Sequence, residues 1–176
     1  MELLECYRRA TEWAAGLVRG AVGQLDKPTP CDEWDVRHLI SHMIDSQRYF
    51  LASVRGEDAQ LHLPMPPDLV GDDPVGAYDA AIGDALREYA APGGVEKAGF
   101  LLGPAFGDTL IHAWDLATAT GQDQTMPEGL AQVAYDFNTA NFKDEFRPGV
   151  LGPKVPVADD ASPQEKLLAF SGRTPA

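Results

Sequence analysis

The sequence predicts an all-α protein, and two observations support this class. Hydrophobic residues recur every three or four positions in five long segments, which is the spacing of an amphipathic helix. No segment shows the strict alternation of apolar and polar residues that is typical of a half-buried strand. With 176 residues, 44% of them hydrophobic, the chain is long enough to bury a substantial core. We therefore expect an up-and-down helical bundle.

The first two helices are predicted over residues 2–24 and 35–55. The first ends before the sequence Lys27-Pro28-Thr29-Pro30, because proline disfavours helical conformation in the residue that precedes it. Asp35 is a good N-cap for the second helix, since its carboxylate can accept a hydrogen bond from a free backbone N–H. A loop rich in proline, glycine and acidic residues follows over residues 56–72.

A third helix is expected to begin at a cap formed by Asp72 or Asp73 and to continue to about residue 90. An irregular connection then leads to a central helix over residues 103–121. Gly121 is expected to end this helix in the left-handed conformation that glycine adopts without strain. The two connections before and after the third helix are expected to shape any pocket beside the central helix.

A last long helix is predicted from Pro127 through Phe142. The remainder is interrupted by proline and glycine before a short amphipathic piece, Gln164–Phe170. Its apolar residues would be exposed unless this segment lay on the bundle. The expected organisation is therefore a bundle over residues 1–145 and an extended C-terminal tail over residues 146–176 that packs on it.

Composition excludes several classes of partner. The net charge of −13 repels a phosphate backbone, so we expect no nucleic-acid binding. No run of about 18 apolar residues is present and the N-terminus lacks the layout of a signal peptide, which predicts a cytoplasmic protein without membrane contact. Cys6 and Cys31 have no metal or redox spacing and are expected to be buried thiols. A monomer or a homodimer fits a bundle of this size.

The central helix carries the residues that point to function. Asp108, His112 and Asp115 are four and three residues apart, so their side chains share one face of the helix. Nearly every other position of this helix is apolar or small, which is typical of a buried helix. Burying two carboxylates and an imidazole is costly unless they pair, form hydrogen bonds or bind a metal.

The pair Asp108 and His112 has the spacing of the two-ligand arm of many zinc sites, in which both side chains point the same way. A third ligand must then come from another helix. Of the remaining histidines His38, His42 and His62, His42 is the best candidate because it borders the apolar face of the second helix.

Each of these residues also has a purely structural interpretation. The two histidines of the proposed site are also compatible with neutral core residues whose nitrogens bond to carbonyl groups. Asp108 is compatible with an acid in the first turn of a helix, stabilised by the helix N-terminus. Asp115 is compatible with an ion pair to an arginine such as Arg48 or Arg87.

Two stretches of the chain resemble signature blocks of a known family. TPCDEWDVRHLISHMI and GDTLIHAWDLATATGQD are similar to blocks of the mycothiol-dependent maleylpyruvate isomerase N-terminal family, within the DinB-like superfamily of four-helix metal proteins. The ending, VLGPKVPVADDASPQEKLLAFSGRTP, resembles that of a small single-domain actinobacterial branch. The resemblance covers about residues 28–175 and implies a DinB-like four-helix bundle.

The resemblance also implies a ligand set. The family's metal ligands fall on His42, Asp108 and His112, although its well-known isomerase has a glutamate at the position of Asp108. Asp115 belongs to the family pattern and is expected to be catalytic, by orienting His112 or relaying a proton. The isomerase has a further C-terminal domain that helps to form its active site, which we do not expect in a chain of this length.

Three protein ligands leave a coordination position open, as in catalytic zinc sites. A divalent metal deprotonates a thiol that it coordinates, and the thiolate is the nucleophile. We therefore expect a metal-dependent enzyme that activates a low-molecular-weight thiol, mycothiol by resemblance. The thiol would be transferred to a small electrophile or would isomerise it. Zinc is the expected metal, and a set of two histidines and one carboxylate also suits iron or nickel.

Two other functions fit the same residues. A hydrolase would use the open position to activate water rather than a thiol. A non-catalytic metal- or ligand-binding bundle would instead close the site with a fourth protein ligand, such as Asp45 or His38.

Overall fold

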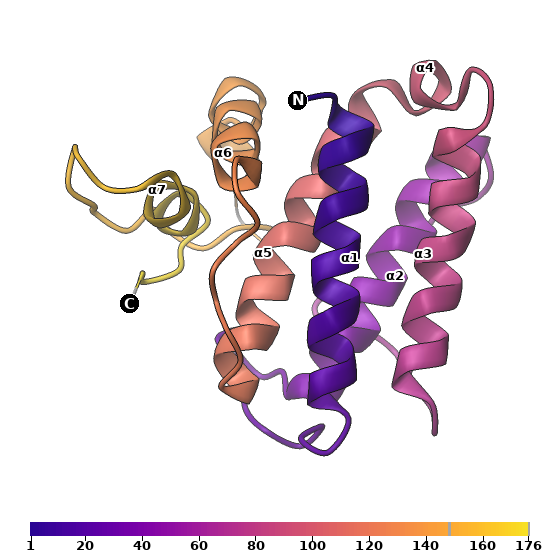
Figure 1. Cartoon of the computed structure of the whole chain (residues 1–176), viewed down its shortest axis with the longest axis horizontal. Coiled ribbons are helices and arrows are strands. Elements are labelled where there is room, and N and C mark those ends of the chain that lie inside the picture. Colours follow the sequence, from indigo (N-terminus) through magenta and orange to yellow (C-terminus); the bar gives the residue numbers. More distant parts are fainter. Residues whose placement is uncertain (148, 176) are drawn as a thin grey trace.

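The structure is a computed structural model that describes residues 1–147 and 149–175, and it confirms the all-α bundle class. Four long helices lie side by side and form the bundle, as Figure 1 shows. They are α1 (Leu3–Ala21), α2 (Val36–Arg55), α3 (Pro74–Ala90) and α5 (Leu102–Thr120). None of the helices in these described residues is both long and apolar enough to cross a membrane.

Shorter elements complete the chain. The helix α4 and the 3₁₀ turn η1 connect α3 to α5 at one end of the bundle, whereas α6 and α7 lie beside α5, away from α3 (Figure 1). Their bounds are α4 (Gly94–Ala98), η1 (Gly99–Leu101), α6 (Leu130–Asn141), η2 (Asp144–Phe146) and α7 (Pro163–Phe170).

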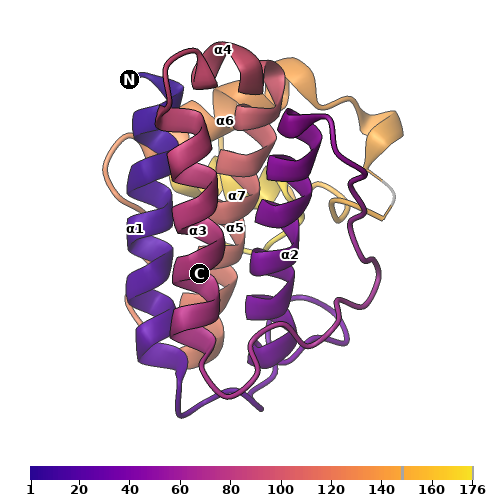
Figure 2. The ribbon, with the colours of Figure 1, turned by 90° about the vertical axis from the view of Figure 1, so that its right-hand side faces the viewer.

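The helix directions do not alternate strictly, because α2 and α3 run the same way. The segment 56–73 leaves the end of α2 and returns along that helix to its beginning (Figure 2). Polar contacts hold it there at successive positions. The backbone N–H of His62 donates to Asp45 Oδ2 at 2.8 Å, and that of Leu69 donates to Ser41 Oγ at 3.1 Å. This segment therefore covers one side of α2 and lets α3 start beside the beginning of that helix.

The predicted helix ends are set by local signals. The carboxylate of Asp35 accepts a hydrogen bond from the backbone N–H of His38 at 2.9 Å and caps α2. Asp73, one of the two predicted caps, does the same for α3. Gly121 ends α5 with φ of 70°, in the left-handed region that favours glycine.

Three segments differ from the sequence prediction. The first helix ends at Ala21 rather than at residue 24. The connection predicted to be irregular contains α4 and η1. The helix predicted to begin at Pro127 begins instead at Leu130, because Gly129 has φ of 82° and interrupts the helical conformation after a turn.

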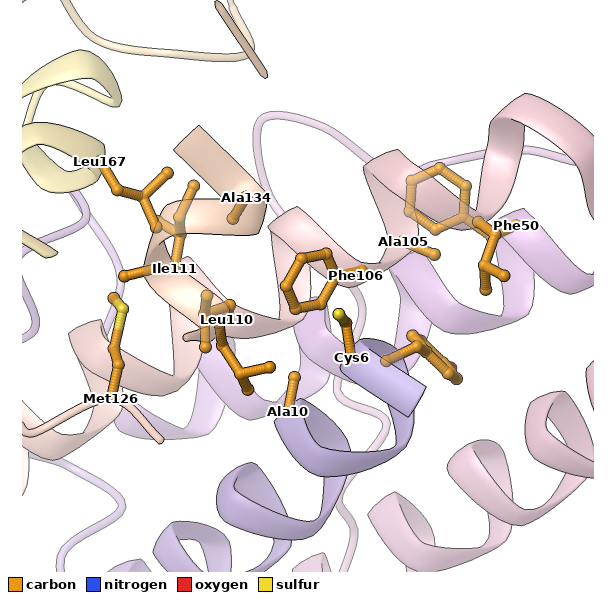
Figure 3. Packing of buried hydrophobic residues seen from close by; sticks show 14 of the residues in the cluster. Cys6, Ala10, Phe50, Ala105, Phe106, Leu110, Ile111, Met126, Ala134 and Leu167 are labelled. Carbon is orange, nitrogen blue, oxygen red and sulfur yellow. The ribbon is translucent and has the colours of Figure 1, made fainter. Parts of the chain in front are cut away.

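The hydrophobic core extends from the bundle to α6 and α7. Figure 3 shows Ile111 of α5 close to Ala134 of α6 and Leu167 of α7, and all three belong to one buried cluster. Cys6 of α1 and Phe106 of α5 belong to the same cluster. This packing brings the C-terminal residues against α5, the helix that carries the candidate site. The division at residue 145 into bundle and tail stays a prediction.

Candidate functional site

The structure brings together His42 from α2 and Asp108 and His112 from α5. The Nε2 atom of each histidine lies 3.5 Å from Asp108 Oδ1. The three donor atoms all lie within 4.8 Å of one another. His42 is buried and the other two side chains are partly buried. Two segments far apart in the sequence thus present two imidazoles and a carboxylate to a common point.

The spacing of these atoms fits a shared cation better than direct hydrogen bonds. A charged N–H···O bond is usually about 2.7–2.9 Å long. Zinc holds nitrogen and oxygen ligands at about 2.0–2.2 Å in tetrahedral geometry, which places neighbouring donors roughly 3.4 Å apart. Both observed separations of 3.5 Å are close to this value. The residues present therefore fit a divalent metal, and metal binding by them stays a prediction.

Further contacts hold Asp108 and His42 in place. The hydroxyl of Ser46, one turn after His42 on α2, donates to Asp108 Oδ2 at 2.7 Å and leaves Oδ1 directed at the histidines. The ring of Trp34 packs on that of His42, with centroids 4.7 Å apart. Within the described residues, the buried Nδ1 atom of His42 has no hydrogen-bond partner, so ring packing is what orients this imidazole.

His112 is instead oriented by a buried carboxylate. His112 Nδ1 lies 3.0 Å from Oδ2 of Asp115, which is completely buried. Arg173 donates to both oxygens of Asp115, from Nη2 at 2.6 Å and from Nε at 3.1 Å. A carboxylate behind a metal-binding histidine commonly fixes the tautomer. Here it favours a proton on Nδ1, so that Nε2 is the nitrogen that faces Asp108 and would bind a metal.

The ion-pair partner of Asp115 is therefore Arg173, and not Arg48 or Arg87 as the sequence suggested. Arg87 lies on the surface and pairs with Asp84. Arg173 reaches Asp115 because α7 packs on α5 and α6, a contact across 58 residues that no local sequence pattern reveals.

A cavity of about 350 Å³ lies directly beside the cluster. Its wall includes Asp108, His112, Ser46 and Arg173, so two of the three candidate ligands face it, whereas His42 is not among the lining residues. Leu61 and Phe100 contribute from the two connections expected to shape a pocket. The rest of the wall comes from α2, α5, α6 and the segment after α6, and the contribution of α6 and of that segment was not foreseen from the sequence. These further lining residues are Phe50, Pro104, Gly107, Ile111, Phe137, Asn138, Asn141, Phe142, Val150 and Leu151.

Residues 7–117 match the family described as mycothiol maleylpyruvate isomerase N-terminal domain, which is more than half of the chain. The chain belongs to this family. The matched region contains all three candidate ligands and Asp115, and it ends near the end of α5. The family name connects the chain with mycothiol-related chemistry.

The similarity of this family member to its relatives extends over nearly the whole chain. Uncharacterized proteins of Mycobacterium tuberculosis, from strains CDC 1551 / Oshkosh and ATCC 25618 / H37Rv, are each 34% identical to it. Each alignment covers 99% of this chain and 99% of the relative. The alignments therefore include α6, α7 and the segment around Arg173, which lie beyond the family match. No solved structure matches the chain.

The structure also tests the structural interpretations of this family member's polar residues. Asp108 lies six residues after the start of α5 at Leu102, so it is not a first-turn acid. His38 pairs with Asp35, and His62 pairs with Asp45 at 3.0 Å. Among the described residues, the cluster of His42, Asp108 and His112 thus contains neither Asp45 nor His38, the fourth ligands considered for a closed site.

Cys31 lies behind the site, next to Asp115 and His112. Its Sγ atom is 3.3 Å from Asp115 Oδ2 and 3.8 Å from His112 Nδ1. Burial, followed by the negative charge of Asp115, raises the pKa of Cys31 well above its usual range. The thiolate is the nucleophilic form, so this environment does not favour a nucleophilic role. Cys31 is partly buried, whereas Cys6 is buried as predicted. Cys6 and Cys31 are both free.

The two aspartates stay ionised at low pH. Burial alone would raise the pKa of Asp108, but the charge of His112, the interactions with His42 and the hydroxyl of Ser46 together lower it to about 2. Burial acts the same way on Asp115, where the charge of Arg173 and the contact with His112 outweigh it and lower the pKa further.

The metal-free protein is therefore expected to lose stability as the pH falls from about 4 towards 2. In the unfolded chain these carboxylates take up protons near pH 3.9, whereas in the folded state they resist protonation to lower pH. The contribution of each carboxylate to stability is therefore fully present above about pH 5. It is lost in this acid range at a rate of at most about 1.4 kcal/mol per pH unit. Urea unfolding across this range measures the slope, and Asp108→Asn should reduce it. An equal slope in wild type and variant would contradict this expectation.

Proposed function

We propose that this protein is a metal-dependent enzyme that activates a low-molecular-weight thiol for transfer to, or isomerisation of, a small electrophile. The observation that carries this proposal is the convergence of His42, Asp108 and His112 beside a cavity. Three protein donors with space next to them are typical of catalytic rather than structural zinc sites. Membership of a family named for mycothiol makes mycothiol the first thiol to test.

Three of these residues would bind the metal, and others hold the metal ligands in position. The two Nε2 atoms and Asp108 Oδ1 would bind the ion, and zinc, iron or nickel suits this donor set. A divalent cation lowers the pKa of a thiol that it coordinates, so that thiolate is present at neutral pH. Ser46 fixes the carboxylate of Asp108, and Asp115 fixes the ring of His112.

The cavity would hold the electrophile next to these ligands. Its largely apolar wall limits the water that can compete for the electrophile. Asp115 is not among the lining residues, and Arg173 and Cys31 surround it. We therefore assign Asp115 the role of orienting His112, because it lies behind the imidazole and away from the cavity.

The proposal is tested by metal analysis and a conjugation assay on the purified protein. Mycothiol with 1-chloro-2,4-dinitrobenzene is a suitable pair, because the sulfur–carbon bond forms as chloride leaves and the thiol proton passes to solvent. We expect one divalent metal per chain and conjugation above the uncatalysed rate, lost on chelation and restored by Zn²⁺.

Three results would overturn this function. A folded protein that binds no divalent metal would remove its basis. Hydrolysis of 4-nitrophenyl acetate without added thiol, together with no thiol conjugation, would instead support a metal-dependent hydrolase. Metal binding without either reaction would support a non-catalytic bundle.

A further inference from the structure

The cavity beside the metal cluster has a mostly apolar wall. Aromatic and aliphatic side chains approach it from α2, α5, α6 and the connecting segments, namely Phe50, Leu61, Phe100, Ile111, Phe137, Phe142, Val150 and Leu151. Its volume of about 350 Å³ is near the lower end of the roughly 300–1,000 Å³ that is typical of small-molecule sites. The space suits a compact, mainly hydrophobic molecule.

The charges around the cavity do not favour an anion. Of the described residues that line it, Arg173 is the one cation. Its Nη2 and Nε atoms both donate to Asp115, and its Nη1 donates to the carbonyl of Ser171 at 3.0 Å. Asp108 adds a negative charge to the wall. A divalent ion balanced by Asp108 and a thiolate would leave no net positive charge for a carboxylate.

Three neutral polar residues are among the described residues that line the cavity, and two of them already donate within the protein, Ser46 to Asp108 and Asn141 to the carbonyl of Phe137. Asn138 of α6 faces Gly107, the residue before Asp108. A β-carbon placed on Gly107 would lie 3.5 Å from Asn138 Oδ1 and 3.6 Å from its Nδ2. The amide can donate one hydrogen bond and accept another, so it can pair with a carbonyl or amide group of a ligand.

We infer that this cavity binds a neutral, mainly apolar molecule with one carbonyl or amide group and discriminates against carboxylates. The inference deepens the proposed function, on which it rests for the identity of this molecule as the electrophile. The polar group pairs with Asn138, and the apolar part lies against the aromatic wall formed with Phe50, Phe100 and Phe137. This assignment excludes dicarboxylic acids as preferred substrates.

Two probes that share one ring system test the assignment. The dissociation constants of 2-naphthamide and 2-naphthoate are measured by calorimetry with the full metal-free chain, in the absence of any thiol. We expect the amide to bind at least about ten-fold more tightly than the carboxylate, because Asp108 is negative and Arg173 is paired with Asp115. Equal affinity, or tighter binding of the carboxylate, would overturn the inference.

A pair of glycine variants locates the binding site. Gly107→Leu fills the space in front of Asn138 and is expected to weaken binding of the amide at least about ten-fold. Gly16→Leu is the matched control, because Gly16 is an exposed residue of α1 with open space around it. If the leucine at position 107 prevents folding, Gly107→Ala replaces it, since its β-carbon meets Asn138 only at ordinary contact distance. Unchanged binding in a folded Gly107 variant would contradict the assignment.

These outcomes are separable from the test of the proposed function. Preference for the amide without thiol conjugation would leave the assignment of the cavity intact and remove the enzyme function. Thiol conjugation with equal binding of both probes would do the reverse.

Discussion

Replacing His42 with alanine is expected to abolish stoichiometric zinc binding while the bundle remains folded. His42 is the candidate ligand that α2 supplies, and without it the remaining two donors both come from α5. Loss of an outer-shell partner of a metal site typically costs about 10–100-fold in affinity, and loss of a ligand should cost more. Titration of metal-free protein with Zn²⁺ against a competing chelator dye measures the change, and circular dichroism reports on the fold.

His38→Ala is the matched control for this experiment. His38 lies one turn earlier on the same helix and pairs with Asp35 at 2.7 Å, outside the cluster. Its removal should leave zinc affinity within about two-fold of wild type, because substitutions away from a site usually have small effects. If His42→Ala bound zinc as tightly as His38→Ala, the proposed ligand set would be wrong.

Replacing Arg173 with methionine is expected to lower the free energy of unfolding by about 3–5 kcal/mol. The change leaves the carboxylate of Asp115 completely buried without its cation, and breaking one side of a buried ion pair typically has this cost. The zinc affinity should also fall about 10–100-fold, because Asp115 orients His112. Urea unfolding monitored by tryptophan fluorescence and the same zinc titration measure the two effects.

Arg87→Met provides the comparison on the surface. Arg87 pairs with Asp84 within α3 and both side chains are exposed, so its loss should cost at most about 1 kcal/mol. The double variant Arg173→Met/Asp115→Leu should recover part of the stability, because it removes the unpaired charge, but should not recover zinc affinity. A loss below about 1 kcal/mol in Arg173→Met alone would show that Asp115 does not depend on this arginine.

The parts of the fold that depend on interactions between residues close in sequence could be predicted. Asp35 caps α2 and Gly121 ends α5 through interactions within a few residues, and these positions are evident from the sequence. The juxtaposition of Asp108 and His112 follows from helical periodicity alone. The choice of His42 as the residue that joins them used its place on an apolar helix face, together with a family resemblance.

The remaining features depend on tertiary packing. The approach of Arg173 and Cys31 to Asp115 requires α7 and the segment before α2 to meet the same side of α5. The parallel course of α2 and α3 depends on the polar contacts of the segment 56–73 with α2. Asn138 faces the cavity only because α6 packs beside α5, and its sequence neighbourhood contains nothing that distinguishes it.

The candidate ligands and most of the cavity wall belong to different parts of the architecture. His42, Asp108 and His112 stand on two bundle helices, whereas Leu61, Phe137 and their neighbours project from peripheral elements. Mutations in those peripheral elements, natural or selected in the laboratory, would change which molecules the cavity binds without moving the donor atoms. Under the proposed function, such a separation would make the protein a convenient starting point for engineering catalysts with different substrate ranges.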